Sequence, residues 1–286
     1  MKKIVLVLLT LSLVVGLFAS CGNSSTQITV VTREESSGTR SAFVELLGIT
    51  VEQDGEEVDG ITPTAVQQRS TSTVRTTVAG DINAIGYISL GSLDDSVKAV
   101  KVDGVEVSVE NIVSGDYKVA RPFNIVTNGE ADEGLEADFI SFIMSAEGQK
   151  ILADEGYIAA DSNAASYEEK SEGFSGLLSI GGSTSVGPVM LKLTEAYTAI
   201  YPDVEFDVQQ NGSGTGISDA IAGNVDIGMA SREVAEDELS QGLVATTIAR
   251  DGIAVIVNLE SSVDSLTSEQ IKNIYLGEIT SWDEIG

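Results

Sequence analysis

Short strand-like runs that end in turns of serine, threonine and glycine, each followed by a helical segment, constrain the fold of this chain more than any other feature. Residues 177 to 180 run into Gly181-Gly182-Ser183-Thr184-Ser185-Val186, and a helical pattern follows. An earlier run, 27 to 32, is followed by Ser36-Ser37-Gly38-Thr39 and by a helical pattern that stops at Gly48. Strands that alternate with helices predict an α/β fold with largely parallel sheets.

Two further strand-like runs end in the same kind of turn. Ser213-Gly214-Thr215 follows the run from 204 to 209, and Ala230-Ser231 follows the run from 226 to 229. Ligands of open α/β sheets bind beyond the carboxyl ends of the strands, where glycine admits backbone N–H groups, hydroxyls donate hydrogen bonds and helix N-termini are positive. A single turn of this kind is also an ordinary helix cap. Four together predict a cage of donors for a small anion.

Arg33 lies four residues before Ser37 and adds a cation to this pattern. Its guanidinium group can hold the same anion through two parallel hydrogen bonds. The alternative is a surface ion pair between Arg33 and Glu34 or Glu35. The glycine-rich turns match neither the phosphate loop GxxxxGK[ST] nor GxGxxG, so nucleotide binding has no support.

The composition excludes several other functions. The 286 residues include no histidine and one cysteine, which rules out a catalytic triad that uses histidine, a zinc site with histidine ligands and a disulfide within the chain. With 16 Lys and Arg against 44 Asp and Glu, the formal charge of -28 does not suit a surface that follows nucleic-acid phosphates. We therefore expect no cofactor, no metal and no nucleic-acid partner.

The N-terminus has the features of an export signal. Lys2 and Lys3 precede an apolar run from 4 to 17, and the small residues after it lead to Cys21. The segment resembles the lipobox of bacterial lipoproteins, although Phe18 stands where leucine is usual. The resemblance implies that residues 1 to 20 are removed and that the thiol of Cys21 is acylated, which anchors the exported chain to the outer face of the cell membrane. A plain secretory signal is the alternative.

Four other segments carry weaker predictions. The polar stretch from 160 to 176 is typical of a linker, and the acidic stretch from 52 to 59 is typical of a solvated loop. A helical region from 135 to 154 is expected to break near Gly148. The extended run from 117 to 127 contains Pro122, which favours a non-central place in a sheet.

Several motifs together resemble the phosphate-binding proteins of bacterial ABC importers. The segment Thr32 to Phe43 (TREESSGTRSAF) is similar to their phosphate-contacting segment. GGSTSV at 181 to 186 resembles the first anion loop of these proteins, QNGSGTG at 210 to 216 the second, and DIGMAS at 226 to 231 the third. The motifs AIGY at 84 to 87 and MSAEGQKI at 144 to 151 are two further family signatures.

The order of these motifs differs from that of the family. In the family the loop that corresponds to Gly182-Ser183-Thr184 opens the mature protein, and the segment with Arg33 lies in its middle. Here the second half of the pattern comes first, and joining Gly286 to Gln27 would restore the usual order. The chain therefore resembles a circularly permuted member, in which the linker 160 to 176 connects the usual ends.

The resemblance implies an α/β, two-lobed periplasmic-binding-protein-like fold of type II, hinged by two crossover strands near 117 to 127 and 252 to 258. One lobe would comprise 27 to 120 plus 257 to 286 and carry the Arg33 loop. The other would comprise 121 to 256 and carry the remaining loops. The residues expected to bind phosphate are Arg33, Ser37, Gly38, Thr39, Ser183, Thr184, Ser185, Val186, Ser213, Gly214, Thr215 and Ser231.

The function implied is that of a monomeric solute-binding lipoprotein, not an enzyme, that captures inorganic phosphate between its lobes and delivers it to an ABC permease. A receptor for another tetrahedral oxyanion such as sulfate, a phosphatase, and a sensory or adhesive lipoprotein are the alternatives. Arg232 stands where the family has an aspartate that accepts the proton of hydrogen phosphate. If Arg232 turns into the cleft, sulfate should bind as well. If it turns outward, Glu233, Asp226 or a backbone carbonyl has to accept that proton.

Overall fold

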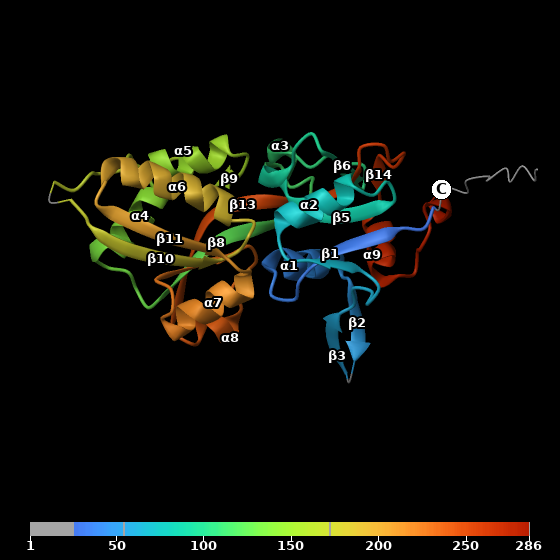
Figure 1. Cartoon of the computed structure of the whole chain (residues 1–286), viewed down its shortest axis with the longest axis horizontal. Coiled ribbons are helices and arrows are strands. Elements are labelled where there is room, and N and C mark those ends of the chain that lie inside the picture. Colours follow the sequence, from blue (N-terminus) through green and yellow to red (C-terminus); the bar gives the residue numbers. More distant parts are fainter. Residues whose placement is uncertain (1–25, 54, 172, 286) are drawn as a thin grey trace, which may run out of the picture.

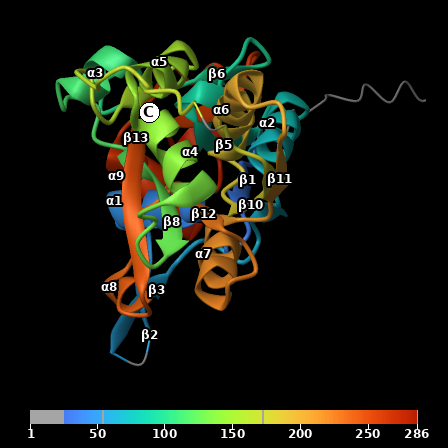
Figure 2. The ribbon, with the colours of Figure 1, turned by 90° about the vertical axis from the view of Figure 1, so that its left-hand side faces the viewer.

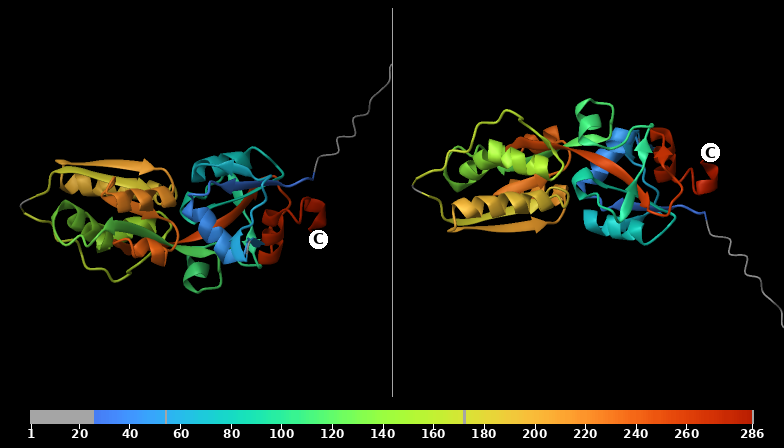
Figure 3. Two further views of the ribbon diagram at one scale, coloured as in Figure 1. Left: turned by 90° about the horizontal axis from the view of Figure 1, so that it is seen from below. Right: turned by 90° about the horizontal axis from the view of Figure 1, so that it is seen from above.

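Residues 26–53, 55–171 and 173–285 are described by a computed structural model. The signal segment 1 to 20 and Cys21 lie outside the described residues. Two lobes lie side by side along the long axis of the molecule (Figure 1). The views from below and above show the strand β13 (Leu243–Asn258) running from one lobe into the other (Figure 3). Within the described ranges, no helix combines the length and apolar character of a membrane span.

One mixed sheet of 10 strands runs through both lobes. Its main path is β11 (Val204–Gln210), β10 (Gly176–Gly182), β12 (Ile227–Ala230), β8 (Ala120–Asn128), β13, β5 (Ala84–Ser89), β1 (Thr29–Arg33) and β4 (Val66–Gln68), with β6 (Val97–Ala99) and β9 (Ile158–Ala159) paired to β13. The pairs at both ends of this path are parallel. The pairs that β8 and β13 make in the middle are antiparallel, so the sheet is less parallel than the sequence predicted.

The helices cover the faces of this sheet. In one lobe they are α1 (Gly38–Leu47), α2 (Thr71–Ala79), α3 (Val109–Val113) and α9 (Ser268–Leu276). In the other they are α4 (Gly134–Met144), α5 (Ala146–Asp154), α6 (Gly187–Ile200), α7 (Ser213–Ala222) and α8 (Glu236–Leu239). The short elements are β2 (Thr50–Gln53), β3 (Glu56–Asp59), β7 (Lys101–Val102), β14 (Ser265–Leu266) and the 3-10 turns Leu90–Ser92 and Trp282–Glu284.

The long strand β13 divides its pairing between the lobes. Residues 243 to 252 pair with β8, which lies beside them in Figure 2, and residues 253 to 257 pair with β5. The buried hydrophobic side chains divide in the same way. One set of core clusters draws on residues 28 to 119 and 253 to 275, and the other on residues 123 to 249. We refer to these as the first and the second lobe.

The two ends of the described chain lie side by side in the first lobe (Figure 1). The backbone N–H of Ile28 donates to the carbonyl of Thr280 at 2.8 Å, and that of Trp282 donates to Thr26 at 2.9 Å. The hydroxyl of Thr26 also donates to Asp283 at 2.7 Å. This proximity is what a circular permutation requires, because the chain of the unpermuted order would run on without a break at this place.

Local sequence signals set several element boundaries. Helix α1 begins after Ser37, whose hydroxyl accepts from the N–H of Arg40, and it ends at Gly48 with a left-handed φ of 61°, as the sequence predicts. The predicted break in the region 135 to 154 falls at Ser145, three residues before Gly148. Ser145 ends α4, and its hydroxyl accepts from the N–H of Gly148 at the start of α5.

Two other predictions were wrong. The acidic stretch 52 to 59 is not a loop but most of the β2–β3 hairpin, whose strands pair from Thr50 with Asp59 to Gln53 with Glu56. Pro122 lies on β8, a central strand between β12 and β13. The sheet tolerates it because β12 pairs with β8 from Asn124 onward, beyond the proline that cannot donate.

Residues 160 to 171 and 173 to 175 are irregular, yet side chains hold this segment against the second lobe. The hydroxyl of Tyr167 donates to the buried carboxylate of Asp138 on α4, and the N–H of Lys170 donates to Tyr201 at 2.7 Å. The rings of Phe174 and Tyr201 also pack edge to face, 5.3 Å apart. Two anchored aromatic residues therefore flank an exposed stretch around Lys170.

Candidate functional site

Four strand ends meet where the lobes face each other. The first lobe contributes the turn from β1 into α1, and the second contributes the turns that follow β10, β11 and β12. Gly38 lies at their junction, because a Cβ atom there would lie only 2.4 Å from the Ser213 hydroxyl and 3.1 Å from that of Ser231. The N–H of Gly214 donates to the carbonyl of Ser36 across the lobes at 2.9 Å. Glycine at 38 thus permits close approach of the backbone.

Six buried hydroxyl groups, which we call the hydroxyl cluster, gather around this junction: Thr39, Thr71, Thr184, Ser185, Ser213 and Ser231. Thr39 and Ser185 face each other across the lobes, with their hydroxyl oxygens 2.9 Å apart. The hydroxyl oxygens of Ser213 and Ser231 are 3.2 Å apart within the second lobe. Hydroxyl hydrogens rotate freely, so groups that now bond to one another can redirect their donors to an anion.

Helix N-termini surround the cluster. Helix α1 starts at Gly38, α6 at Gly187 and α7 at Ser213, each directly after its turn. The Ser183 hydroxyl accepts from the N–H groups of Ser185 and Val186 at 3.2 and 3.3 Å, so it shapes the α6 turn. The N-terminal turns of helices carry unpaired N–H groups and a partial positive charge. The arrangement therefore suits a small anion.

The predicted residues differ in how closely they reach the cluster. Val186 is buried in the hydrophobic core of the second lobe, and its N–H donates to the Ser183 hydroxyl at 3.3 Å. Ser37 is buried and caps α1. Gly214 and Thr215 are half-buried on the first turn of α7.

Arg33 is buried, with only 2% of its side chain exposed, and it is paired with Glu34. Its Nε and Nη2 atoms donate to the two carboxylate oxygens at 2.8 and 2.7 Å. The Nη1 atom faces the Thr71 hydroxyl at 3.4 Å and so points into the cluster. Arg33 thus makes the pair with Glu34 that the sequence left as an alternative, but in the interior instead of on the surface.

The strand that carries Arg33 is held by aromatic packing. The hydroxyl of Tyr87 lies 2.8 Å from that of Thr32 and accepts from the N–H of Arg33 at 3.2 Å. Its ring stacks on Phe43 with the centroids 4.0 Å apart. Burial raises the pKa of Tyr87, so its hydroxyl stays protonated at neutral pH.

Arg232 turns away from the cluster. Its Nη1 and Nη2 atoms each donate to Glu238 at 2.7 Å, and Nη1 also donates to the carbonyl of Glu233. Asp226 lies just before β12, at the end opposite Ser231, and accepts from Ser179 at 2.7 Å. Glu233 is exposed. The third anion loop therefore presents neither a guanidinium group nor a carboxylate to the cluster.

Thr71 is the member of the hydroxyl cluster that the sequence did not predict. It begins α2 after the cap residue Ser70, and its hydroxyl lies 3.1 Å from that of Ser185 and 3.4 Å from that of Thr184. Strand β4 precedes it, so this is a fifth strand end with a hydroxyl turn. The signal was missed because β4 is short and reads Val-Gln-Gln, without the apolar pattern of a strand.

A buried ion pair joins the two crossover strands beside the third anion loop. Arg121 on β8 and Asp251 on β13 lie directly opposite each other, with 1% and 0% of their side chains exposed. Burial raises the pKa of the Asp251 carboxyl, while Arg121 and Ser89 act in the opposite direction. The sequence hint was opposite charges in two otherwise apolar segments, but their pairing could not be read from it.

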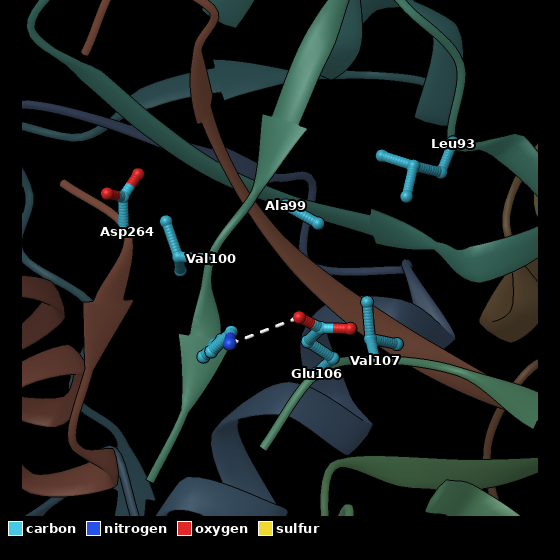
Figure 4. A pocket seen from close by; sticks show the side chains of 7 residues that line it. Leu93, Ala99, Val100, Glu106, Val107 and Asp264 are labelled. Atoms are coloured by element: carbon cyan, nitrogen blue, oxygen red, sulfur yellow. Dashed lines mark ion pairs between the residues drawn. The ribbon is translucent and has the colours of Figure 1, made fainter. Parts of the chain in front are cut away.

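A separate hollow lies elsewhere on the first lobe (Figure 4). It has a volume of about 420 Å³, and the ion pair between Lys101 and Glu106, 3.1 Å apart, lies in its lining. Leu93, Ala99 and Val107 supply apolar side chains, and Asp264 lies at one side. This hollow shares no residue with the hydroxyl cluster.

Comparison with known proteins agrees with this geometry. A family model described as a PBP superfamily domain matches residues 17–147 and 159–286. The phosphate-binding protein PstS 2 of Streptococcus agalactiae is 47% identical over 277 residues, 95% of this chain and 94% of that protein. One continuous alignment thus covers nearly all of both chains, so the two share one order of segments.

Two further relatives extend the comparison. The crystal structure of a phosphate-binding protein of a phosphate ABC transporter from Streptococcus pneumoniae matches with a TM-score of 0.73 and 42% identity, over 91% of this chain and 100% of that chain. The phosphate-binding protein PstS of Bacillus subtilis is 37% identical over 140 residues, 48% of this chain and 43% of that protein. By its fold, its motifs and these relatives, the chain belongs to the PBP superfamily and, within it, to the family of phosphate-binding proteins.

Proposed function

We propose that this protein captures inorganic phosphate between its two lobes and delivers it to an ABC importer. The observation that supports this most is the hydroxyl cluster, which draws buried donors from both lobes to one place beside Arg33. A ligand held there touches both lobes at once, so binding favours their closure. The cluster contains no nucleophile paired with a general base, and we propose a receptor and not an enzyme.

The ligand contacts we propose come from two sides. Arg33, Ser37, Gly38 and Thr39 would bind from the first lobe, which comprises about 27 to 119 plus 253 to 285. The second lobe would comprise about 120 to 252, a division four residues earlier on β13 than the sequence suggested, because residues 253 to 257 pair with β5. Its contacts would be Ser183, Thr184, Ser185, Val186, Ser213, Gly214, Thr215 and Ser231.

The cellular setting is part of the proposal. We propose that Cys21 carries the lipid anchor, that the mature protein works as a monomer on the outer face of the cell membrane, and that an ABC permease receives the phosphate. Both PstS 2 of Streptococcus agalactiae and this chain place the Arg33 segment before the other anion loops. The circularly permuted order is therefore proposed as a natural property of this chain, whose two ends lie side by side and are linked by the hydrogen bond from Ile28 to Thr280.

Sulfate is the second candidate ligand, and the third anion loop is the reason to consider it. That loop offers no carboxylate to accept the proton of hydrogen phosphate, whereas sulfate carries no proton at neutral pH. Glu34 is the carboxylate beside Arg33, and it lies 3.5 Å from where a Cβ atom on Gly212 would stand. Its charge next to the second anion loop disfavours a fully deprotonated anion.

Calorimetric titration of the mature protein, stripped of bound ligand, with phosphate and with sulfate tests the proposal. We expect phosphate to bind at one site and sulfate to bind more weakly by at least about tenfold, equivalent to about 1.4 kcal/mol. Binding of neither anion would refute the proposed function. Equal binding of both would replace it with a general oxyanion receptor.

A further inference from the structure

The ion pair between Arg121 and Asp251 belongs to a longer chain of buried hydrogen bonds. Asp251 accepts from the Ser89 hydroxyl at 2.8 Å and from the N–H of Leu90 at 3.2 Å, both at the end of β5 in the first lobe. Its other carboxylate oxygen accepts from Nη2 and Nε of Arg121 at 3.0 and 3.3 Å. Asp251 thus faces the first lobe with one carboxylate oxygen and Arg121, on the crossover strand β8, with the other.

Arg121 continues this chain into the second lobe. Its Nη1 atom donates to the backbone carbonyl of Ser231 at 3.1 Å. The N–H of Ser231 in turn donates to the Ser213 hydroxyl at 3.1 Å. The guanidinium group of Arg121 therefore connects the two crossover strands to the third anion loop. This loop carries the Ser231 hydroxyl of the cluster and contacts the Ser213 hydroxyl.

The location of the pair gives it a role that packing alone does not. The strands β8 and β13 leave one lobe and enter the other at this level, since Gly252 pairs with Ala120 and Ile253 pairs with Ser89. Ser89, Arg121, Ser231 and Asp251 are all buried, so the hydrogen bonds among these four residues are shielded from water. Buried ion pairs add little net stability compared with apolar packing, but they are sensitive to the loss of either partner.

We propose that Arg121 and Asp251 are positioning residues for anion binding. They hold the third anion loop at a fixed orientation to the end of β5, so the hydroxyls of Ser213 and Ser231 face the first lobe when the lobes close. Neither side chain touches the anion in this scheme. The inference rests on the proposed function, because anion binding is what it explains.

Two conservative variants test the pair. Arg121→Lys keeps the charge but cannot reach both Asp251 and Ser231 with a planar fork, and Asp251→Asn removes the charge at nearly constant volume. We expect each to weaken phosphate binding about tenfold or more in protein that circular dichroism shows to be folded. Asp138→Asn is the matched control. It alters a buried carboxylate that accepts from Tyr197 at 2.8 Å in the core of the second lobe, so it should lower the melting temperature and leave the phosphate Kd within about threefold.

A double-mutant cycle distinguishes positioning from general destabilisation. In a background that carries both Ser213→Ala and Ser231→Ala, the two hydroxyls that Arg121 positions are gone, so Arg121→Lys should cost less than about threefold in phosphate affinity there. Should Arg121→Lys and Asp251→Asn fail to fold, Ser89→Ala removes only the side-chain link to the first lobe and should weaken phosphate binding about fivefold or more.

Phosphate affinities within threefold of wild type for the variants that fold, or an equal loss in both backgrounds, would overturn the positioning role and leave the pair as a structural feature. Wild-type protein that binds neither phosphate nor sulfate would instead overturn the proposed function.

Discussion

Replacing Arg33 by alanine tests the proposed anion site most directly. The side chain is 2% exposed and makes three hydrogen bonds, two to Glu34 and one to Thr71. Its removal takes the positive charge away from a site shielded from water and leaves the Glu34 carboxylate, 16% exposed, without its partner beside the incoming anion. Loss of one partner of a buried charge pair costs about 2–5 kcal/mol. At about 1.4 kcal/mol per tenfold, phosphate affinity should fall roughly 30-fold to 4,000-fold.

The assay is calorimetric titration with phosphate, with a thermal melt in its absence to confirm that the variant is folded. Arg33→Lys keeps the charge without the planar fork and should lose less affinity than the alanine variant. Arg75→Ala is the control, because Arg75 is 30% exposed, pairs with Asp94 and lies outside the cluster. A phosphate Kd for Arg33→Ala within threefold of wild type would show that Arg33 supports the fold and not the ligand.

Four further predictions address the anchor, the linker and the third anion loop. Cys21→Ser should prevent acylation. If the variant is processed and still fractionates with membranes as wild type does, the lipobox interpretation is wrong. Limited tryptic cleavage after the exposed Lys170 should leave two fragments that stay associated and bind phosphate, because Tyr167 and Phe174 anchor the chain on both sides of the cut. Loss of phosphate binding after cleavage at this position alone would show that the segment contributes to the site. Because Arg232 is bound to Glu238, Arg232→Ala should change the phosphate Kd less than about threefold, and a tenfold change in a competition titration with sulfate would place its guanidinium in the cleft. The hydrogen bonds from Arg232 lower the pKa of Glu238, so ionised Glu238 stabilises the fold above the ordinary glutamate pKa of about 4.3, and this contribution is lost as the pH falls further. The melting temperature of Glu238→Gln should therefore lie below that of wild type at pH 7 and approach it in acid. A difference in melting temperature that stays constant with pH would refute this.

Much of the site could be predicted from the sequence because its parts are local. A strand end, a hydroxyl cap and a helix start are neighbours in the chain, so Ser37 and the start of α1 follow from short-range rules. The turns at 183 to 186 and 213 to 215 follow in the same way. Their convergence could be expected from the edge of the sheet that all of them share.

The contacts that the sequence could not supply depend on distant residues. Thr71 enters the cluster because β4 pairs with β1, and three residues of polar sequence carry no strand signal. The bond between Arg121 and Asp251 joins residues on two strands whose register only the folded sheet defines. Pro122 looked unsuited to a central strand because the point at which β12 begins to pair is a tertiary property.

The division of β13 between the lobes has a consequence for how the protein is made. The second lobe is one continuous stretch of chain, so it can complete its core as soon as it has emerged during synthesis or export. The first lobe cannot, because the segment of β13 that pairs with β5 and the helix α9 come last. Until then β5 presents an open edge of buried-type residues, Ala-Ile-Gly-Tyr-Ile-Ser, to whatever is nearby. We therefore expect the second lobe to fold before the first, although the first lobe is synthesised earlier. The first lobe should then depend more on chaperones that shield exposed strands.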